Sequence, residues 1–448
     1  MSSTTVPVPP SPAGGAPAAA SAPSSGPASG APSTAPPAAM PFTPYQKLIV
    51  AILAFLQFTI VLDFMIMSPL GAFLLPALHI TTRQFGLAVS VYAFSAGIAG
   101  FLAAGFADRF DRKRLLMFFY AGFVVGTFLC GVANSYHFLL AARMVTGIFG
   151  GVIGSISFAI IADLFAFQQR GRVMGVVQTS FAASQVLGLP LGMILSNHWG
   201  WHAPFLMIVA LAMAAGLLMS VGMKPINEHL KLQRDGSALK HLIKTVSRRR
   251  YLQAFGTMAL MVTGGFMLMP FGSAFTVNNI GISTQKLQHI YFATGLCSIV
   301  AGPLLGRISD RFGKYALFCA GSALGAVMIF IYTHMGHTPI WQVIAVNVLL
   351  FVGITSRIIS ASALVSAVPD PASRGAFMAV NSSIQQVSGG LAAALGGLIV
   401  VQTASGTLEG YDVLGYVVIA SMAVTVTLLY FINRMVNQSI AAPPAAPV

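Results

Sequence analysis

Long, uninterrupted apolar stretches recur along this chain of 448 residues and constrain its fold more than any other feature. Each contains about twenty residues, enough for a helix to cross roughly 30 Å of hydrocarbon. The stretches are continuously apolar, whereas strands of a membrane barrel alternate between apolar and polar residues. The sequence therefore predicts an all-α integral membrane protein with twelve transmembrane helices, at 46–75, 85–107, 115–133, 137–165, 173–195, 202–223, 252–276, 286–306, 315–334, 340–368, 377–403 and 414–436.

The charge content supports a membrane class. Hydrophobic residues make up 56% of the chain and charged residues 8%, too few charges to cover the surface of a soluble domain of this size. The net charge of +14 comes mostly from Lys and Arg on the side of both termini, with Arg83 and Lys286 on the other side. This is the positive-inside pattern. We therefore expect a multi-pass protein of the plasma (inner) membrane with both termini cytoplasmic, and no nucleic-acid partner.

An internal repeat divides the apolar part of the chain into two halves. Asp108–Arg109–Phe110 recurs as Asp310–Arg311–Phe312, and "FMIM" (64–67) recurs as "FMLM" (266–269). "RGRVMGV" (170–176) recurs as "RGAFMAV" (374–380) in the same order, so a six-helix unit is duplicated, a plan typical of transporters. The predicted domains are a disordered Pro/Ala/Ser-rich cytoplasmic tail (1–41), an N-terminal six-helix half (42–223), a basic cytoplasmic linker (224–251), a C-terminal six-helix half (252–436) and a cytoplasmic tail (437–448).

The repeated motifs resemble those of the major facilitator superfamily, and the resemblance extends from about residue 44 to 436. "GFADRFDRKRLL" (105–116) resembles the family signature G-x-x-x-D-R-x-G-R-K with both glycines replaced, whereas the second copy keeps Gly306 and Gly313. "LLAARMVTG" (139–147) is similar to the helix-4 signature of proton-driven exporters, with Arg143 in the arginine position. "VLGLPLG" (186–192) and "GWHAPF" (200–205) look like segments of arabinose-efflux-permease-like members, although a leucine separates Gly188 from Pro190.

The resemblance implies a secondary active transporter with the major facilitator fold. We expect proton-coupled efflux (antiport) of a small organic solute, sugar-like or drug-like, by alternating access. The alternatives are a proton-coupled importer or facilitator on the same fold, a membrane enzyme and a non-transporting membrane receptor. The chain is not expected to be an enzyme, because its acids are scattered and it has no G-x-x-x-x-G-K-[ST] loop. We expect a monomer without cofactor, whose partners are a small-molecule substrate, protons and the lipid bilayer.

One carboxylate, Asp63, interrupts the first apolar stretch. A carboxylate in a membrane or a core costs several kcal/mol unless it is paired, protonated or in contact with water. In the second copy Gly265 takes this place, so the fold itself does not require the acid. The family plan puts this helix beside the central cavity, where Asp63 would reach water. We predict that Asp63 takes up the coupling proton and that Arg143 modulates it; the alternative is a fixed structural ion pair.

Polar and flexible side chains within other stretches are candidates for the substrate cavity. An arginine there could hold an anionic or polyhydroxylated substrate, or anchor its helix to its neighbours. Amide side chains bind sugars or polar drugs, but they also join helices. Methionines adapt to apolar drugs. The predicted cavity comprises Arg357, Asn381, Gln385, Gln386, Met67, Met267 and Met269.

Charged residues in the loops are predicted to form a cytoplasmic gate. The resemblance implies that the Asp and Arg of the signature latch the two halves together on this face while the cavity opens outward. The alternative is that these charges only set the topology. The predicted gate comprises Asp108, Arg109, Arg112, Asp163, Asp310, Arg311 and Lys314.

Small residues mark two of the predicted helices. The helix-5 motif has Gly188, Pro190 and Gly192, and the fourth stretch has Gly147, Gly150, Gly151 and Gly154. Glycines at such spacing let helices approach closely, so close packing is the expected role. Histidines gather near the outer face, but no pair on one helix has the spacing of metal ligands. No metal site is predicted.

Overall fold

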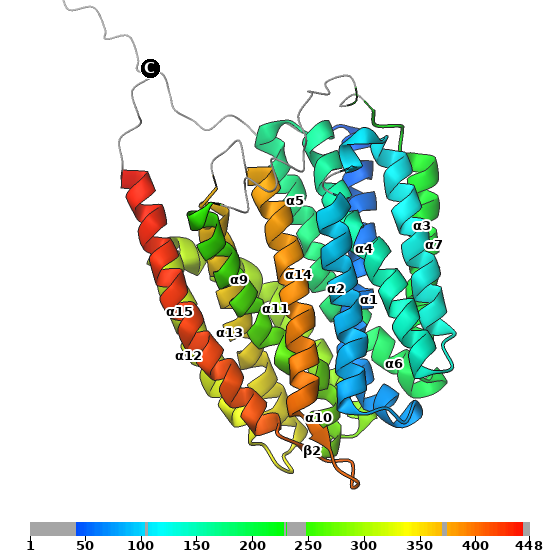
Figure 1. Cartoon of the computed structure of the whole chain (residues 1–448), viewed down its shortest axis with the longest axis vertical. Coiled ribbons are helices and arrows are strands. Elements are labelled where there is room, and N and C mark those ends of the chain that lie inside the picture. The colour runs from blue at the N-terminus through cyan, green and yellow to red at the C-terminus, as the bar shows by residue number, and fades with distance from the viewer. Residues whose placement is uncertain (1–41, 104–105, 228–229, 231–247, 370–373, 442–448) are drawn as a thin grey trace, which may run out of the picture. The chain divides into compact units, whose positions relative to one another are not determined.

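Helices make up nearly all of the part that the structure describes, which is residues 42–103, 106–227, 230, 248–369 and 374–441 of a computed structural model (Figure 1). Eleven helical segments in this part are long and apolar enough to cross a membrane. A further helix, α14, occupies the place of the predicted stretch 377–403. The predicted all-α architecture is confirmed. The predicted N-terminal tail and most of the predicted linker lie outside the described residues.

Each half contributes six spans. The first half contains α1 (Pro44–Ala77), α2 (Thr82–Ala103), η1 (Ala107–Arg109), α3 (Arg112–Gly131), α4 (Tyr136–Leu164), α5 (Phe167–Ala183), η2 (Ser184–Gly188), α6 (Leu189–Trp199) and α7 (Ala203–Gly222). The second half contains α9 (Arg249–Leu268), η4 (Met269–Phe271), α10 (Gly272–Asn278), α11 (Thr284–Phe312), α12 (Lys314–Thr333), α13 (Ile340–Ser366), α14 (Arg374–Ile399), β1 (Val401–Gln402), β2 (Leu408–Glu409) and α15 (Tyr411–Ala441).

The spans run alternately up and down, so the bundle has two ends. The linker end is where α7 finishes and α9 begins, and the hairpin end is where β1 and β2 lie (Figure 1). The two strands pair antiparallel, with Val401 opposite Glu409. Asn279 holds this hairpin: its side chain donates to the Leu408 carbonyl at 2.9 Å and accepts from the Leu408 N–H at 2.9 Å.

Two of the predicted stretches are not single α-helices. The stretch 173–195 contains the π-helical turn η2, in which the Leu189 N–H bonds to the Ser184 carbonyl. The stretch 252–276 contains the 3₁₀ turn η4, which includes Pro270. Proline supplies no N–H to the helical ladder, so the backbone changes its bonding pattern nearby. A π turn also accommodates one extra residue, which fits the leucine that separates Gly188 from Pro190.

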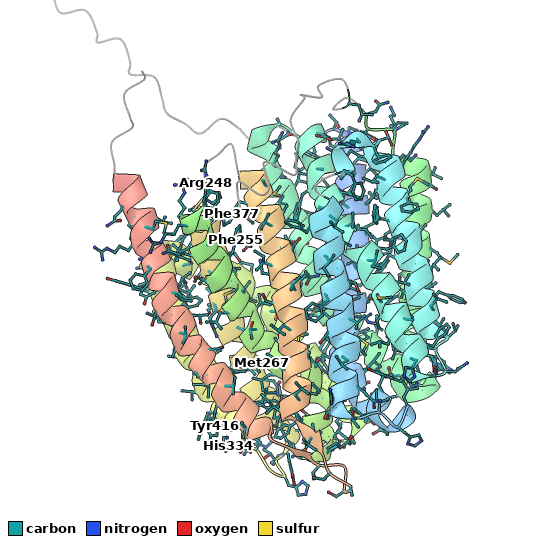
Figure 2. The ribbon with its side chains drawn as sticks, viewed as in Figure 1. Arg248, Phe255, Met267, His334, Phe377 and Tyr416 are labelled. Carbon is teal, nitrogen blue, oxygen red and sulfur yellow. The ribbon has the colours of Figure 1, made fainter. Side chains whose placement is uncertain are left out.

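The apolar core is shared at one end of the bundle and divided at the other. Toward the hairpin end a single cluster contains residues of both halves, such as Leu70 of α1 and Phe271 of η4. Toward the linker end each half has its own cluster. In the second half this cluster includes Phe255 of α9 stacked on Phe377 of α14, with ring centroids 4.7 Å apart (Figure 2). Phe101 of α2 packs against that cluster. The shared core thus lies toward the hairpin end, and Phe101 extends the contact between the halves toward the linker end.

Candidate functional site

A buried ion pair lies inside the first half. Arg143 of α4 donates through Nη1 to Asp63 Oδ2 of α1 at 2.8 Å, and both side chains are fully shielded from solvent. Thr127 of α3 donates to Asp63 Oδ1 at 3.2 Å. The structure thus brings together the acid and the base that the sequence proposed as partners. The expectation that Asp63 reaches water does not hold in this conformation, because α3 and α4 cover it.

Aromatic and thiol groups complete the surroundings of the pair. The guanidinium carbon of Arg143 lies 4.3 Å from the ring centroid of Tyr92 on α2. Cys130 of α3 lies 3.8 Å from the Thr146 hydroxyl of α4. Nε and Nη2 of Arg143 have no hydrogen-bond partner. The carboxylate and the aromatic ring are therefore the groups that stabilise this buried cation.

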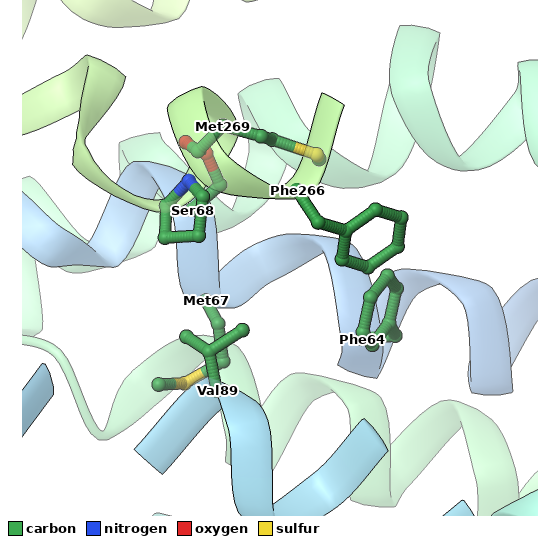
Figure 3. A pocket seen from close by; sticks show the side chains of 7 residues that line it. Phe64, Met67, Ser68, Val89, Phe266 and Met269 are labelled. Atoms are coloured by element: carbon green, nitrogen blue, oxygen red, sulfur yellow. The ribbon is translucent and has the colours of Figure 1, made fainter. Parts of the chain in front are cut away.

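A small apolar pocket lies on the other side of α1, where the two halves meet. It has a volume of about 10 Å³, roughly the room for one water. Figure 3 shows Phe64 of α1 facing Phe266 of α9 across it. Its walls are Phe64, Met67, Ser68, Val89, Phe266, Met269 and Pro270. A substrate can occupy this place only after the halves move apart.

The two copies of the repeat face each other across this pocket. Phe64 and Phe266 are equivalent positions of "FMIM" and "FMLM", and their ring centroids are 5.4 Å apart. Met67 and Met269, the last methionine of each copy, both line the pocket, whereas Met267 is buried in the shared core (Figure 2). Asp63 and Gly265 come just before the facing phenylalanines. The acid is thus one residue away from the contact between the halves.

Hydrogen bonds close the pocket toward the hairpin end. Ser68 of α1 donates to the Met269 carbonyl at 2.5 Å, and Ser273 of α10 donates to the Ser68 carbonyl at 2.6 Å. At the end of the bundle, Thr82 of α2 donates to the Val400 carbonyl at 2.5 Å. These bonds cross between the halves, so they stabilise the closed arrangement of the hairpin end.

Arg357 lies within the second half, away from this pocket. Its Nη2 donates to Thr425 Oγ1 of α15 at 2.9 Å, and its guanidinium carbon lies 5.3 Å from the ring centroid of Phe318 on α12. The side chain is 5% exposed. These contacts fit the anchoring role for this arginine better than contact with substrate.

The amide residues of α14 have mixed positions. Asn381 is buried, and its Oδ1 has no hydrogen-bond partner. Gln385 and Gln386 are half-buried. Gln386 lies beside α2, since a Cβ at Gly97 would be 3.2 Å from the Gln386 Cβ. Gln386 therefore lies at the contact of the two halves, where α2 and α14 pack side by side (Figure 1).

The helix-5 motif packs on the acid-bearing helix. A Cβ at Gly188 would lie 2.4 Å from Leu62 Cδ1, and a Cβ at Gly192 would lie 2.4 Å from Ile66 Cδ1. Pro190 stands between them at the start of α6. The glycines thus let η2 and α6 approach α1 on both sides of Asp63. Both glycines lie at close helix contacts.

The ion pair described among the predicted gate residues lies within one half. Arg112 Nε lies 3.1 Å from Asp163 Oδ2, and both residues belong to the first half. Arg109 is exposed. The side chain of Asp108 lies outside the described part of the structure. In the second copy, three exposed residues lie at the linker end: Asp310, Arg311 and Lys314.

Sequence reasoning missed two residues that organise these regions. Asp111 caps α3 through the Arg114 N–H at 2.8 Å and also accepts from the Ile226 N–H at 2.8 Å. It therefore ties the start of α3 to the chain beyond α7. The second is Tyr92, whose ring supports Arg143. An acid directly before a helix signals a cap, whereas no sequence signal pairs an arginine with a distant ring.

The sequence is similar to a known protein family and to several bacterial transporters. A family profile described as Major Facilitator Superfamily matches residues 53–393 and 254–445. An uncharacterized MFS-type transporter of Bacillus subtilis (strain 168) is 27% identical over 61% of this chain and 70% of its own length. An inner membrane transport protein of Escherichia coli (strain K12) is 24% identical over 75% of this chain and 73% of its own. A "Probable sugar efflux transporter" of Helicobacter acinonychis (strain Sheeba) is 24% identical over 62% and 70%.

Solved structures share the fold at lower identity. A bacterial homolog of the human lysosomal transporter Spinster, in an inward-facing and unoccupied conformation, has a TM-score of 0.72 at 15% identity and covers 90% of this chain and 100% of that chain. A nucleoside transporter has a TM-score of 0.67 at 14% identity, covering 86% and 99%. Both likenesses establish the architecture, and neither identifies a substrate.

Proposed function

Because the chain belongs to the major facilitator superfamily and is a secondary transporter, we propose that it exports a small, uncharged, largely apolar organic molecule in exchange for protons. The observation that carries the proposal is the buried Asp63–Arg143 pair one residue from the pocket between the halves. The relative named for sugar efflux supports the outward direction.

Asp63 is the proposed proton carrier. The ion pair exists only while the carboxylate is ionised, and a proton on Asp63 leaves the neighbouring guanidinium without its counter-ion. A buried cation without a counter-ion is costly, so protonation favours a conformation in which Arg143 finds other partners. The reverse change releases the proton. This exchange of partners is the physical basis proposed for coupling.

The walls of the pocket support an apolar substrate. None of Asp63, Arg143 and Arg357 is among the residues that line the pocket, and each of them bonds within its own half. Phenylalanine, methionine, valine and proline make up the walls, with one serine. Such a surface binds apolar and aromatic groups and offers too few hydrogen-bonding partners for a sugar. Of the two expected classes, we favour the drug-like one.

The distribution of basic residues supports a cytoplasmic linker end. On α3 and the segment before it, Arg109, Arg112, Lys113 and Arg114 lie there, whereas Arg83 and Lys286 lie at the hairpin end. By the positive-inside rule the linker end and both termini face the cytoplasm. In this orientation the closed hairpin end is the outer face of the transporter. We propose the plasma (inner) membrane as its location.

Exchange of one proton for an uncharged molecule moves one positive charge inward, which gives a direct test. Full-length protein in liposomes is assayed for pH-driven movement of N-phenyl-1-naphthylamine, with arabinose and ethidium as the sugar-like and cationic comparators. A membrane potential should add about 2.3 kcal/mol of driving force per 100 mV. We expect movement of the uncharged probe that responds to both pH and potential. Transport of arabinose alone, or no response to pH, would refute the proposal.

A further inference from the structure

A column of three aromatic rings connects the ion pair to the second half. The Arg143 guanidinium carbon lies 4.3 Å from the Tyr92 centroid. The Tyr92 and Phe64 centroids are 5.4 Å apart, with an interplanar angle of 36°. The Phe64 and Phe266 centroids are also 5.4 Å apart, with an angle of 35° (Figure 3). The groups come from α4, α2, α1 and α9 in turn, and the last step crosses between the halves.

The first ring of this column has little freedom to move. Tyr92 is 2% exposed. A Cβ at Gly147 would lie 2.4 Å from the Tyr92 carbonyl oxygen, and a Cβ at Gly150 would lie 3.1 Å from its hydroxyl. The absence of side chains at these two positions lets α2 and α4 enclose the ring. Closely packed groups of this kind switch between discrete arrangements rather than deform gradually.

The pocket lies at the second step of the column. Phe64 and Phe266 are both walls of a pocket that now has room for little more than one water. An opening of the hairpin end that separates α1 from η4 and α10 also separates these two rings. Phe64 then loses its support in the second half, while its other face still contacts Tyr92.

Few other groups act on the carboxylate. The charged or titratable groups around Asp63 are Arg143 from α4, Tyr92 from α2 and Cys130 from α3. The described residues of η2, α5, α6, α7, η4 and α10, which pack against α1, contribute no charge to it. The ring of Tyr92 is therefore a contact through which the position of the second half can reach Arg143.

We propose that Tyr92 and Phe64 are positioning residues that couple protonation of Asp63 to opening of the hairpin end. The inference rests on the proposed function, in that Asp63 must take up a proton. When the halves close, Phe266 presses Phe64 against Tyr92, and Tyr92 holds Arg143 on the ionised acid. When a proton neutralises the acid, Arg143 and Tyr92 are released, and Phe64 no longer favours contact with Phe266.

Two readouts on the same full-length protein in nanodiscs test the coupling. The infrared band of a protonated carboxyl group measures the protonation of Asp63. The band is assigned to this residue by its loss in Asp63→Asn. Pulsed electron resonance between encoded spin labels at the exposed positions Arg83 and Ser405 follows the hairpin end. In the wild-type protein both should titrate with one midpoint, and the open population should rise at least tenfold as the pH falls.

Substitutions in the aromatic column distinguish loss of the coupling between protonation and opening from a general loss of packing. In Phe64→Leu and Tyr92→Leu we expect the carboxyl band still to titrate, while the open population changes less than twofold with pH. Tyr92→Phe keeps the ring and should restore wild-type behaviour. The matched control is Phe85→Leu, which removes another ring contact between the halves, Phe85 to Phe271 at 6.1 Å, without touching Arg143. It should keep the pH dependence.

Two outcomes would overturn the proposal in different ways. If Phe64→Leu retains a wild-type rise in the open population, the aromatic column does not couple the two events, and Asp63 can still be the proton carrier. If the wild-type protein shows no titrating band that Asp63→Asn removes, the proposed function fails first. Should Tyr92→Leu not fold, Phe64→Leu and Phe266→Leu decide the question.

Discussion

A single ion pair, Asp63 with Arg143, is the residue-scale feature on which this account depends. Replacing one member leaves the other charged and buried, which typically costs about 3–5 kcal/mol, whereas replacing both with apolar residues of similar volume is often neutral. We expect Asp63→Leu and Arg143→Met each to lower the free energy of unfolding by such an amount, and the double variant to lose much less.

The pH response of these variants has a defined sign. In Arg143→Met the remaining carboxyl can take up a proton, so part of the lost stability should return as the pH is lowered. In Asp63→Leu the guanidinium stays charged at any accessible pH, so no recovery is expected. Unfolding by denaturant in detergent at two pH values measures both. Equal recovery in the two variants would contradict the assignment of Asp63 as the titrating group.

Glycines of α4 give a second residue-scale prediction. A Cβ at Gly151 would lie 2.3 Å from the Ala96 carbonyl oxygen, whereas a Cβ at Gly154 would meet nothing within 4 Å. Gly151→Ala should therefore force α2 and α4 apart and cost about 1–3 kcal/mol, as overpacking does. Gly154→Ala is the matched control and should be neutral or slightly stabilising. Thermal unfolding of the two purified variants would show no difference if the close approach were not required.

The sequence predicted the candidate site best where a charged residue stands alone in an apolar stretch. A lone acid in an apolar stretch and an arginine in another made Asp63 and Arg143 candidates, and the structure joins them. Arg357 had the same rarity, but only tertiary packing decides that it faces Thr425 within its own half. The direction in which a helical side chain points across a bundle depends on helix rotation, which an apolar stretch without a polar face leaves undefined.

At the level of whole helices, the predicted spans can be compared with the observed helices and their interruptions. The sequence predicted every span, since length and hydropathy suffice for that. It did not predict that η2 and η4 interrupt two of the stretches, because proline in a membrane helix can be accommodated without a break. Nor did it predict that Asp111 joins the start of α3 to Ile226. Bonds of this kind depend on which loops lie side by side.

The cap of α3 can be tested directly. Asp111→Ala removes the acceptor for the N–H groups of both Arg114 and Ile226, so it should cost about 0.5–2 kcal/mol. Asp111→Asn keeps one acceptor oxygen and should cost less. Hydrogen exchange should be faster in the first turn of α3 for Asp111→Ala. Unchanged exchange there would show that the cap does not hold this element.

At the scale of the whole molecule, the closed hairpin end depends on small polar contacts between the halves. Ser68→Ala with Ser273→Ala removes the bonds from Ser68 to Met269 and from Ser273 to Ser68, each with a net contribution of about 0.5–1.5 kcal/mol. The open population at the hairpin end should rise accordingly in spin-label distance measurements. Ser196→Ala is the control, because the Ser196 hydroxyl donates to the Gly192 carbonyl of its own helix. An equal shift in both variants would contradict this role.

The repeat made the two-half plan predictable, and the family match agrees with it. The conformation was not predictable, because the same sequence must be stable in more than one arrangement of its halves. That the repeated "FMIM" and "FMLM" segments face each other also required the structure. The duplication identified which residues correspond, and the packing of α1 on η4 and α10 brought them together.

If Asp63 carries the coupling proton, its replacement by asparagine should uncouple transport by the protein in liposomes. Two fluxes of the uncharged probe N-phenyl-1-naphthylamine are compared: accumulation driven by a pH gradient, and exchange of probe for probe without a gradient. We expect Asp63→Asn to abolish the pH-driven accumulation while probe exchange continues. Accumulation by Asp63→Asn at the wild-type rate would contradict this expectation.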